Sequence, residues 1–257
     1  MKKQEIEERR NAQIRKSNVL IQKSRFDLSV QQQKIVLYLA SFIQPYDDDF
    51  KLYEFNIQEF CETVGIDETS GKNYYDLKDA IQQISNKSLW IKLPNGRDTL
   101  VRWIEKPYID ENSGTIQIRL DRDMKPFLLR LKDNYTCYEL IYVLRMKSKY
   151  SVRLYELVKS IHYHENEKYE RIYSVDELKS LLGAENYVEY RDFNSRVIKT
   201  AVKEINEFTD KELAIEPLKR GRKVYALKLS MTTKEPLERF ETIEKLETAL
   251  NKGKQDD

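Results

Sequence analysis

The sequence predicts an α+β fold in which one structural unit occurs twice. Residues 55–65 recur as residues 173–183, at an offset of 118 positions, and residues 77–84 recur as residues 198–205. In both copies a predicted helix, a glycine turn and a second helix lead into a β-hairpin pattern. This order is typical of winged helix-turn-helix domains. We therefore expect two tandem winged helix-turn-helix domains that are related by internal duplication.

The first helices of the two copies share the residues that mark their ends. Each has an N-cap residue with an acidic residue three positions later, namely Asn56 with Glu59 and Ser174 with Glu177. Gly65 and Gly183 stand where a helix ends on a left-handed residue, which glycine adopts at little cost. The second helices are expected over residues 72–86 and 192–208. Shared caps support duplication strongly, because a cap fixes where a helix begins.

Alternating residues after each second helix predict strands that would form the wings. The first copy has β-patterned runs at residues 89–93, 100–104 and 115–120, and the second at residues 213–215 and 224–229. The turn of the second wing is the basic run 219–222. Between the copies, residues 124–131 read as an apolar connector. Thr136 and Glu139 have the spacing of a capping box, which predicts a helix from residue 136 onward, and a further helix is expected over residues 151–161.

Length and composition place this chain among soluble proteins with one or two domains. We expect a charged N-terminal tail (1–16), a first winged helix (17–131), a second winged helix (132–231) and a charged C-terminal tail (232–257). The net charge is only +2, no apolar run reaches the roughly 20 residues that span a bilayer, and no secretion signal precedes the first domain. The two cysteines lack disulfide or metal-ligand spacing, which favours reduced thiols and a cytoplasmic location.

One run resembles a known signature. Residues 147–157 read Lys-Ser-Lys-Tyr-Ser-Val-Arg-Leu-Tyr-Glu-Leu, and this pattern resembles that of the Rep_3 superfamily of plasmid replication initiators. The resemblance extends over about residues 17–231 and includes the runs at 26–29, 135–138 and 192–197.

The resemblance implies a non-enzymatic protein that uses neither a cofactor nor a metal. Members of this superfamily bind short direct repeats of double-stranded DNA (iterons) at a plasmid origin as monomers, and they help to open the adjacent segment. They also recruit the host replication initiator and helicase machinery. Homodimers form through the first winged helix, which the resemblance links to repression rather than initiation.

In a helix-turn-helix the second helix presents its exposed face to base edges in the major groove. In the second copy this face offers five candidates for DNA binding: Arg191, Asn194, Arg196, Lys199 and Lys203. Arginine can pair with guanine and asparagine with adenine through two hydrogen bonds. The alternative is an ordinary solvated helix face. The matching face of the first copy carries Asn73 and Lys78, but the neighbouring Asp76 and Asp79 repel phosphate, so we expect a smaller contribution there.

Two further groups of residues are candidates for phosphate contact. The second wing carries Lys219, Arg220, Arg222 and Lys223 around a glycine, whereas the first-copy run has the sparser set Lys92, Arg97 and Arg102. The start of the signature helix carries Lys147, Lys149, Tyr150 and Arg153, where free backbone N–H groups would also attract an anion. The alternatives are a solubilising hairpin tip and, for Arg153, a structural pair with a buried acid.

Three other functions compete with this interpretation. Tyr155, His162 and His164 match short motifs of metal-dependent rolling-circle nickases, but their order is reversed and Tyr155 lies on an apolar helix face. A tandem winged-helix transcriptional repressor would fit the same fold, and it would bind a palindrome as a stable dimer. A winged helix that binds only protein is disfavoured by the basic run at residues 219–223.

Overall fold

The structure is a computed structural model that describes residues 3–65, 71–162 and 168–252, without the side chains of residues 71–74 and 252. Its first half contains α1 (Lys3–Arg10), β1 (Gln13–Ser17), α2 (Asn18–Lys23), β2 (Ser24–Arg25), α3 (Val30–Ala40), β3 (Tyr53–Asn56), α4 (Ile57–Val64), α5 (Gly71–Ser85), β4 (Ser88–Lys92), β5 (Asp98–Arg102), β6 (Tyr108–Asp110), β7 (Thr115–Ile118), the 3-10 turn η1 (Arg122–Met124) and α6 (Lys125–Leu128). Its second half contains β8 (Tyr135–Glu139), α7 (Ile141–Leu144), α8 (Lys149–Ile161), β9 (Tyr169–Ser174), α9 (Val175–Leu182), α10 (Tyr190–Phe193), the π turn η2 (Asn194–Ile198), α11 (Lys199–Phe208), β10 (Lys211–Arg220), β11 (Lys223–Thr233) and α12 (Pro236–Lys252). None of the helices in the described ranges is long and apolar enough to cross a bilayer.

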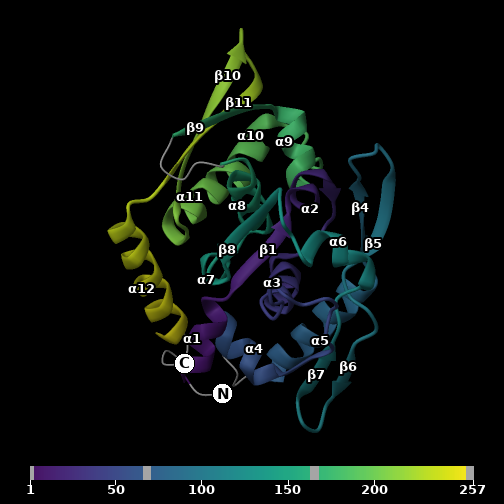
Figure 1. Ribbon diagram of the computed structural model, residues 1–257. Helices are drawn as coiled ribbons and strands as arrows, with labels where there is room; N and C mark the ends of the chain where they lie inside the picture. Colours follow the sequence, from purple (N-terminus) through teal and green to yellow (C-terminus); the bar gives the residue numbers. More distant parts are fainter. Residues whose placement is uncertain (1–2, 66–70, 163–167, 253–257) are drawn as a thin grey trace.

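The second half forms the expected winged helix, at the top of Figure 1. Helix α9 and the helix made by α10, η2 and α11 follow β9, and the long β10–β11 hairpin is the wing. The three strands form one antiparallel sheet in the order β10-β11-β9. Strand β11 of the wing thus pairs with β9, the strand that precedes the first helix. This pairing fixes the position of the wing relative to the two helices.

The first half is also a winged helix, but its strands pair differently from our expectation. Strand β3 precedes α4 and pairs with β7, in a sheet ordered β3-β7-β6. The β6–β7 hairpin therefore takes the topological place that the β10–β11 wing takes in the second domain. Hairpin β4–β5, which we expected to be the first wing, joins the short β2 strand in a separate sheet.

The predicted caps of the first helices are confirmed. Asn56 and Ser174 are the N-caps of α4 and α9, and each side chain accepts a backbone N–H from its own first turn. The helices end at Gly65 (φ 71°) and Gly183 (φ 67°), both left-handed. Duplication is thus preserved in the backbone as well as in the sequence.

The expected tails are not tails in the structure. Residues 3–10 form α1, and β1 then pairs along its whole length with β8. At the other end, α12 runs from the second domain to the first along one side of the molecule (Figure 1) and buries Leu246 and Leu250. The buried Arg10 joins both ends, since its Nη1 donates to Glu247 at 2.6 Å and to Asn251 at 2.9 Å. Charge composition misled us because a few buried apolar residues, Ile6, Leu246 and Leu250, are enough to dock these segments, although Leu237 and Phe240 of α12 stay exposed.

Residues 135–139 are strand β8, so the helix expected from Thr136 is wrong. Thr136 and Tyr138 are buried while Tyr135 is exposed, and this period of two fits a strand. The Thr136 hydroxyl bonds to the Asn18 side chain at 2.7 Å instead of capping a helix. Strands β1 and β8 lie between the two domains (Figure 1), where one continuous apolar core extends from α3 through α8 to α11.

Candidate nucleic-acid interface

The second helix of the second domain is anchored by one apolar face. Phe193, Val197, Ala201 and Ile205 recur every four residues along α10, η2 and α11, and each has 0% of its surface exposed. This face packs on α8, β10 and the rest of the core. The opposite face must therefore point to solvent.

The opposite face of this helix carries the predicted DNA-reading residues. Arg191, Arg196, Lys199 and Lys203 are exposed and Asn194 is half-buried. None of the four cations forms an ion pair within the described parts of the chain. A row of uncompensated cations on a rigid helix suits a polyanionic partner.

The helix contains a π turn that the sequence did not indicate. Residues 194–198 have π geometry, and the backbone N–H of Lys199 donates to the carbonyl of Asn194, five positions earlier. Such a turn inserts one extra residue and rotates the two ends of the helix relative to each other. Arg191 and Lys203 are consequently placed at different angles from those in a regular α-helix.

The wing of the second domain is a long hairpin that ends in a two-residue turn. Arg220 pairs with Lys223 across Gly221 and Arg222, and the φ of Gly221 is 60°, a conformation that two-residue hairpin turns require. All four predicted cations, Lys219, Arg220, Arg222 and Lys223, are exposed. The Arg220 guanidinium lies 4.5 Å from the centre of the Tyr225 ring. The wing projects beyond the body of the domain (Figure 1), so its tip can reach a neighbouring surface.

The first domain offers less positive charge on its second helix. Asn73 lies in α5, but its side chain is outside the described residues. Lys78 forms an ion pair with Glu111, which lies in the turn between β6 and β7. Asp76 and Asp79 are exposed on the same helix. The weaker contribution that we expected from this helix stays a prediction, and the Lys78 pair supports it.

The start of the signature helix does not hold a free anion site. Helix α8 begins at Lys149, with the N-cap Ser148 accepting from Tyr150 N. The backbone N–H groups of Lys147 and Ser148 donate to the Glu204 carboxylate, at 3.0 and 3.3 Å. We expected a phosphate to supply negative charge here, but Glu204 in α11 of the same chain supplies it instead.

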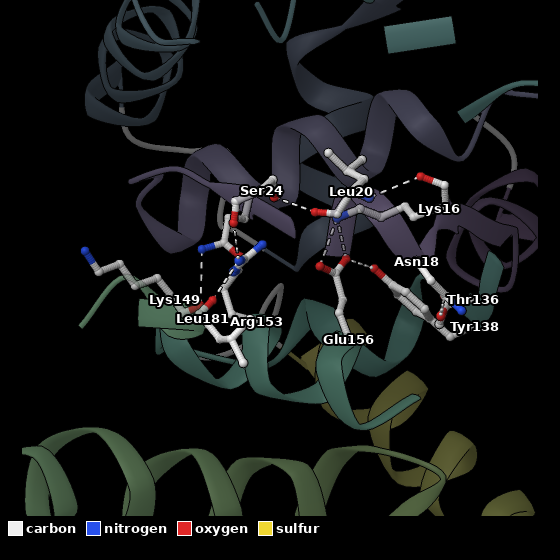
Figure 2. Close-up of polar contacts among 12 residues, drawn as sticks. Lys16, Asn18, Leu20, Ser24, Thr136, Tyr138, Lys149, Arg153, Glu156 and Leu181 are labelled. Carbon is white, nitrogen blue, oxygen red and sulfur yellow. Dashed lines mark hydrogen bonds and ion pairs between the residues drawn. The ribbon is translucent and has the colours of Figure 1, made fainter. Parts of the chain in front are cut away.

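Two signature residues that we expected to bind DNA are buried. Tyr150 is 7% exposed and packs edge-to-face on Tyr187. Arg153 is 6% exposed, and its Nη2 donates to the carbonyls of Leu181 (2.7 Å) and Ser24 (3.4 Å), as Figure 2 shows. Arg153 is therefore structural, as our alternative proposed, although it is held by carbonyls rather than by a buried acid.

The side chain of Arg153 joins the two domains. Ser24 belongs to β2 and Leu181 to α9, and the guanidinium also stacks 4.1 Å from the centre of the Phe26 ring. Burial lowers the pKa of Arg153 to about 10. Nearby, Lys149 pairs with Asp27 at 2.5 Å, which leaves Lys147 as the one exposed cation of the four signature residues.

Sequence reasoning missed a buried polar cluster on the other side of α8. Figure 2 shows Glu156 between Lys16 and Tyr138. Lys16 Nζ lies 2.7 and 2.9 Å from the two Glu156 oxygens, and the Tyr138 hydroxyl donates to Glu156 at 2.6 Å. Burial lowers the pKa of Lys16, whereas the Glu156 charge opposes this effect. Residues 14–18 read Ile-Arg-Lys-Ser-Asn, a pattern that gives no signal for a buried lysine.

The two residues of the nickase hypothesis that the structure describes, Tyr155 and His162, do not form an active site. Tyr155 is fully buried, and its hydroxyl donates to Asp210 at 2.8 Å. Burial, together with the Asp210 charge, raises the pKa of Tyr155 well above its usual value. His162 is buried at the end of α8, and His164 lies outside the described residues. A nucleophile in this position could not reach a phosphodiester.

Comparison with known proteins agrees with this geometry. The family model described as "Initiator Replication protein, WH1" matches residues 13–159, and "Initiator Rep protein, WH2" matches residues 174–231. A replication initiation protein of Escherichia coli is 26% identical over 207 residues, which cover 77% of this chain and 63% of the relative. This chain thus aligns with less than two thirds of that relative. The crystal structure of Pi initiator protein in complex with iteron DNA has the same fold, with a TM-score of 0.71, 20% identity and coverage of 88% of this chain and 99% of that one.

Proposed function

Since this chain belongs to the initiator replication protein family, we propose that it initiates plasmid replication by binding directly repeated origin sequences. The observation that carries the proposal is the uncompensated row of cations on the second helix of the second domain. It stands beside a projecting wing that carries four more exposed cations. The choice of ligand is supported by family membership and by the shared fold with Pi initiator protein, which was crystallised in complex with iteron DNA.

The residues of the second helix and the cations of the wing would contribute to DNA recognition in different ways. In this proposal Asn194, Arg196 and Lys199 contact base edges in the major groove and so select the sequence. The wing cations contact backbone phosphates, which strengthens binding to any duplex and makes it sensitive to salt. Sequence specificity would reside mainly in the second domain.

The remaining parts of the proposal rest on the family resemblance. We propose a cytoplasmic, non-enzymatic protein without a cofactor, which binds iterons as a monomer and forms homodimers through its first winged helix. The bound protein would aid origin opening and recruit the host replication initiator and helicase machinery. A transcriptional repressor would instead bind a palindrome as a dimer, so the stoichiometry on direct repeats and on inverted repeats separates the two functions.

Replacing Arg196 with alanine is expected to weaken binding to the origin repeats by about 10- to 100-fold, because one good pair with a base discriminates by roughly 1–3 kcal/mol. Binding to scrambled DNA should change little. The measurement is a fluorescence titration with both duplexes at fixed salt. Lys245→Ala is the matched control, since it removes a cation of α12 that is 80% exposed. Equal losses on both duplexes would contradict the assignment of Arg196 to a base.

A further inference from the structure

Among the large apolar residues that the structure describes, Val188 is the most exposed, at 81%. It lies in the turn between α9 and the second helix of the second domain, directly before Glu189, the N-cap of α10. A single exposed apolar residue is common on protein surfaces. The significance of Val188 therefore depends on how it is held and on what lies opposite it when the protein binds DNA.

The backbone around Val188 is held by buried neighbours. The Val188 carbonyl accepts a hydrogen bond of 2.9 Å from Nζ of Lys179, a residue of α9 that is 8% exposed. The same ammonium group lies 5.6 Å from the centre of the fully buried Phe193 ring. On the other side, the Tyr187 ring packs edge-to-face on Tyr150, with the ring centres 5.9 Å apart. Val188 is thus an exposed side chain on a fixed backbone.

The place of Val188 in the helix-turn-helix brings it close to base pairs. In this motif the second helix lies in the major groove, and the residues at its start contact the base edges. Val188 stands two positions before the first residue of α10 and six before Asn194, which is the first of the three residues assigned above to base edges. A fixed side chain at this point therefore faces the floor of the groove when the helix is bound.

The chemistry of this segment suits a base edge and not the DNA backbone. The side chain of Val188 neither donates nor accepts a hydrogen bond, so it gains nothing from a phosphate or from the polar groups of the bases. The major groove offers one apolar group, the C5-methyl of thymine. Glu189, the next residue, is exposed; its carboxylate would be repelled by phosphate but can accept from N4 of cytosine.

We propose that Val188 is a specificity-determining residue that packs on the methyl group of one thymine in each origin repeat. The inference rests on the proposed function and adds to it a contact that carries no charge. Burial of one methyl group contributes about 0.8 kcal/mol, which corresponds to about fourfold in affinity. The contact would select thymine over cytosine at one position, which the cations of the helix and wing cannot do through charge.

The test replaces each thymine of an origin-repeat duplex in turn with deoxyuridine, which removes the methyl group and keeps the base pair. Fluorescence titration at fixed salt then compares the wild type with Val188→Ala. The wild type should lose about fourfold in affinity at one position. Val188→Ala should bind the unmodified duplex more weakly by a similar factor and lose nothing further at that position, because the two changes remove the same contact. Losses at other positions should be equal in both proteins.

Two controls separate this contact from a general effect of the substitution. Ile172→Ala shortens another exposed apolar residue of the second domain, in β9 and 56% exposed, and should leave the affinity for every duplex unchanged. Val188→Ala should also keep the wild-type slope of log affinity against log salt, because an apolar contact releases no counterions. If the wild type and Val188→Ala respond alike to deoxyuridine at every position, the contact is refuted.

The same titrations distinguish failure of this inference from failure of the proposed function. Repeat-specific binding that is weakened in Arg196→Ala but unchanged in Val188→Ala would leave the proposed function standing and remove the thymine contact. A wild-type protein that binds repeat and scrambled duplexes equally well would overturn the proposed function, and the inference would fall with it.

Discussion

Glu156→Ala is expected to lower the free energy of unfolding by about 3–5 kcal/mol, the usual cost of removing one partner from a buried ion pair. Lys16 is 4% exposed and Glu156 is 1% exposed, so water cannot replace the lost carboxylate. The Tyr138 hydroxyl would lose its acceptor as well. The change would loosen β1 and β8 from α8, and with them the junction between the domains. Urea unfolding followed by circular dichroism measures the effect.

Two further variants show whether charge or packing causes this loss. Glu156→Gln keeps an acceptor for Tyr138 but leaves Lys16 without a counter-charge, so most of the loss should remain. Changing Lys16 and Glu156 together to methionine removes both charges and should recover much of the stability, because apolar residues often replace a buried pair without cost. A loss of less than about 1 kcal/mol in Glu156→Ala would mean that the pair is not shielded from water in solution.

Reversing the charges of Arg220 and Arg222 to glutamate is expected to weaken binding to every duplex by about 100-fold at physiological salt. Each phosphate contact adds about 0.9 to the slope of log affinity against log salt, so the slope should become shallower by about 2. Both side chains are exposed at the tip of the wing, and the fold should therefore tolerate the change. Titrations of repeat and scrambled DNA at several salt concentrations measure both quantities.

The matched control reverses two charges far from the wing, Arg239→Glu with Lys245→Glu on α12. These two changes alter the net charge equally but should leave the salt slope unchanged. If the wing variant and the control behave alike, the wing does not touch the DNA backbone and its cations act only through the overall charge.

Local patterns predicted local structure well. The N-caps at Asn56 and Ser174 and the left-handed Gly65 and Gly183 are properties of a few adjacent residues, and the structure has all four as expected. We also expected Arg191, Arg196, Lys199 and Lys203 on the exposed face of the second helix, and all four are exposed. The same local reasoning failed for Thr136, whose cap-like spacing was overridden by pairing with Lys16 of β1, 120 positions earlier in the chain.

Parts of the candidate site depend on distant partners and could not be predicted. The guanidinium of Arg153 is a group that often binds phosphate, yet here it is held by the carbonyls of residues 24 and 181. We expected the backbone N–H of Lys147 to attract an anion, but in the structure it donates to Glu204 of α11. The π turn at residues 194–198 has no signature in residue type.

The pairing of β1 with β8 constrains how this protein can fold during synthesis. Gln13 lies opposite Glu139, so β1 has no partner until some 126 further residues have been added. Contacts at such separation are slow to form, and an unpaired strand is exposed to misassembly meanwhile. The contact of Arg10 with Glu247 forms later still, because Glu247 follows it by 237 positions. The domain that is translated first is therefore among the last to be completed, and a nascent chain arrested before β8 should lack the β1–β8 sheet.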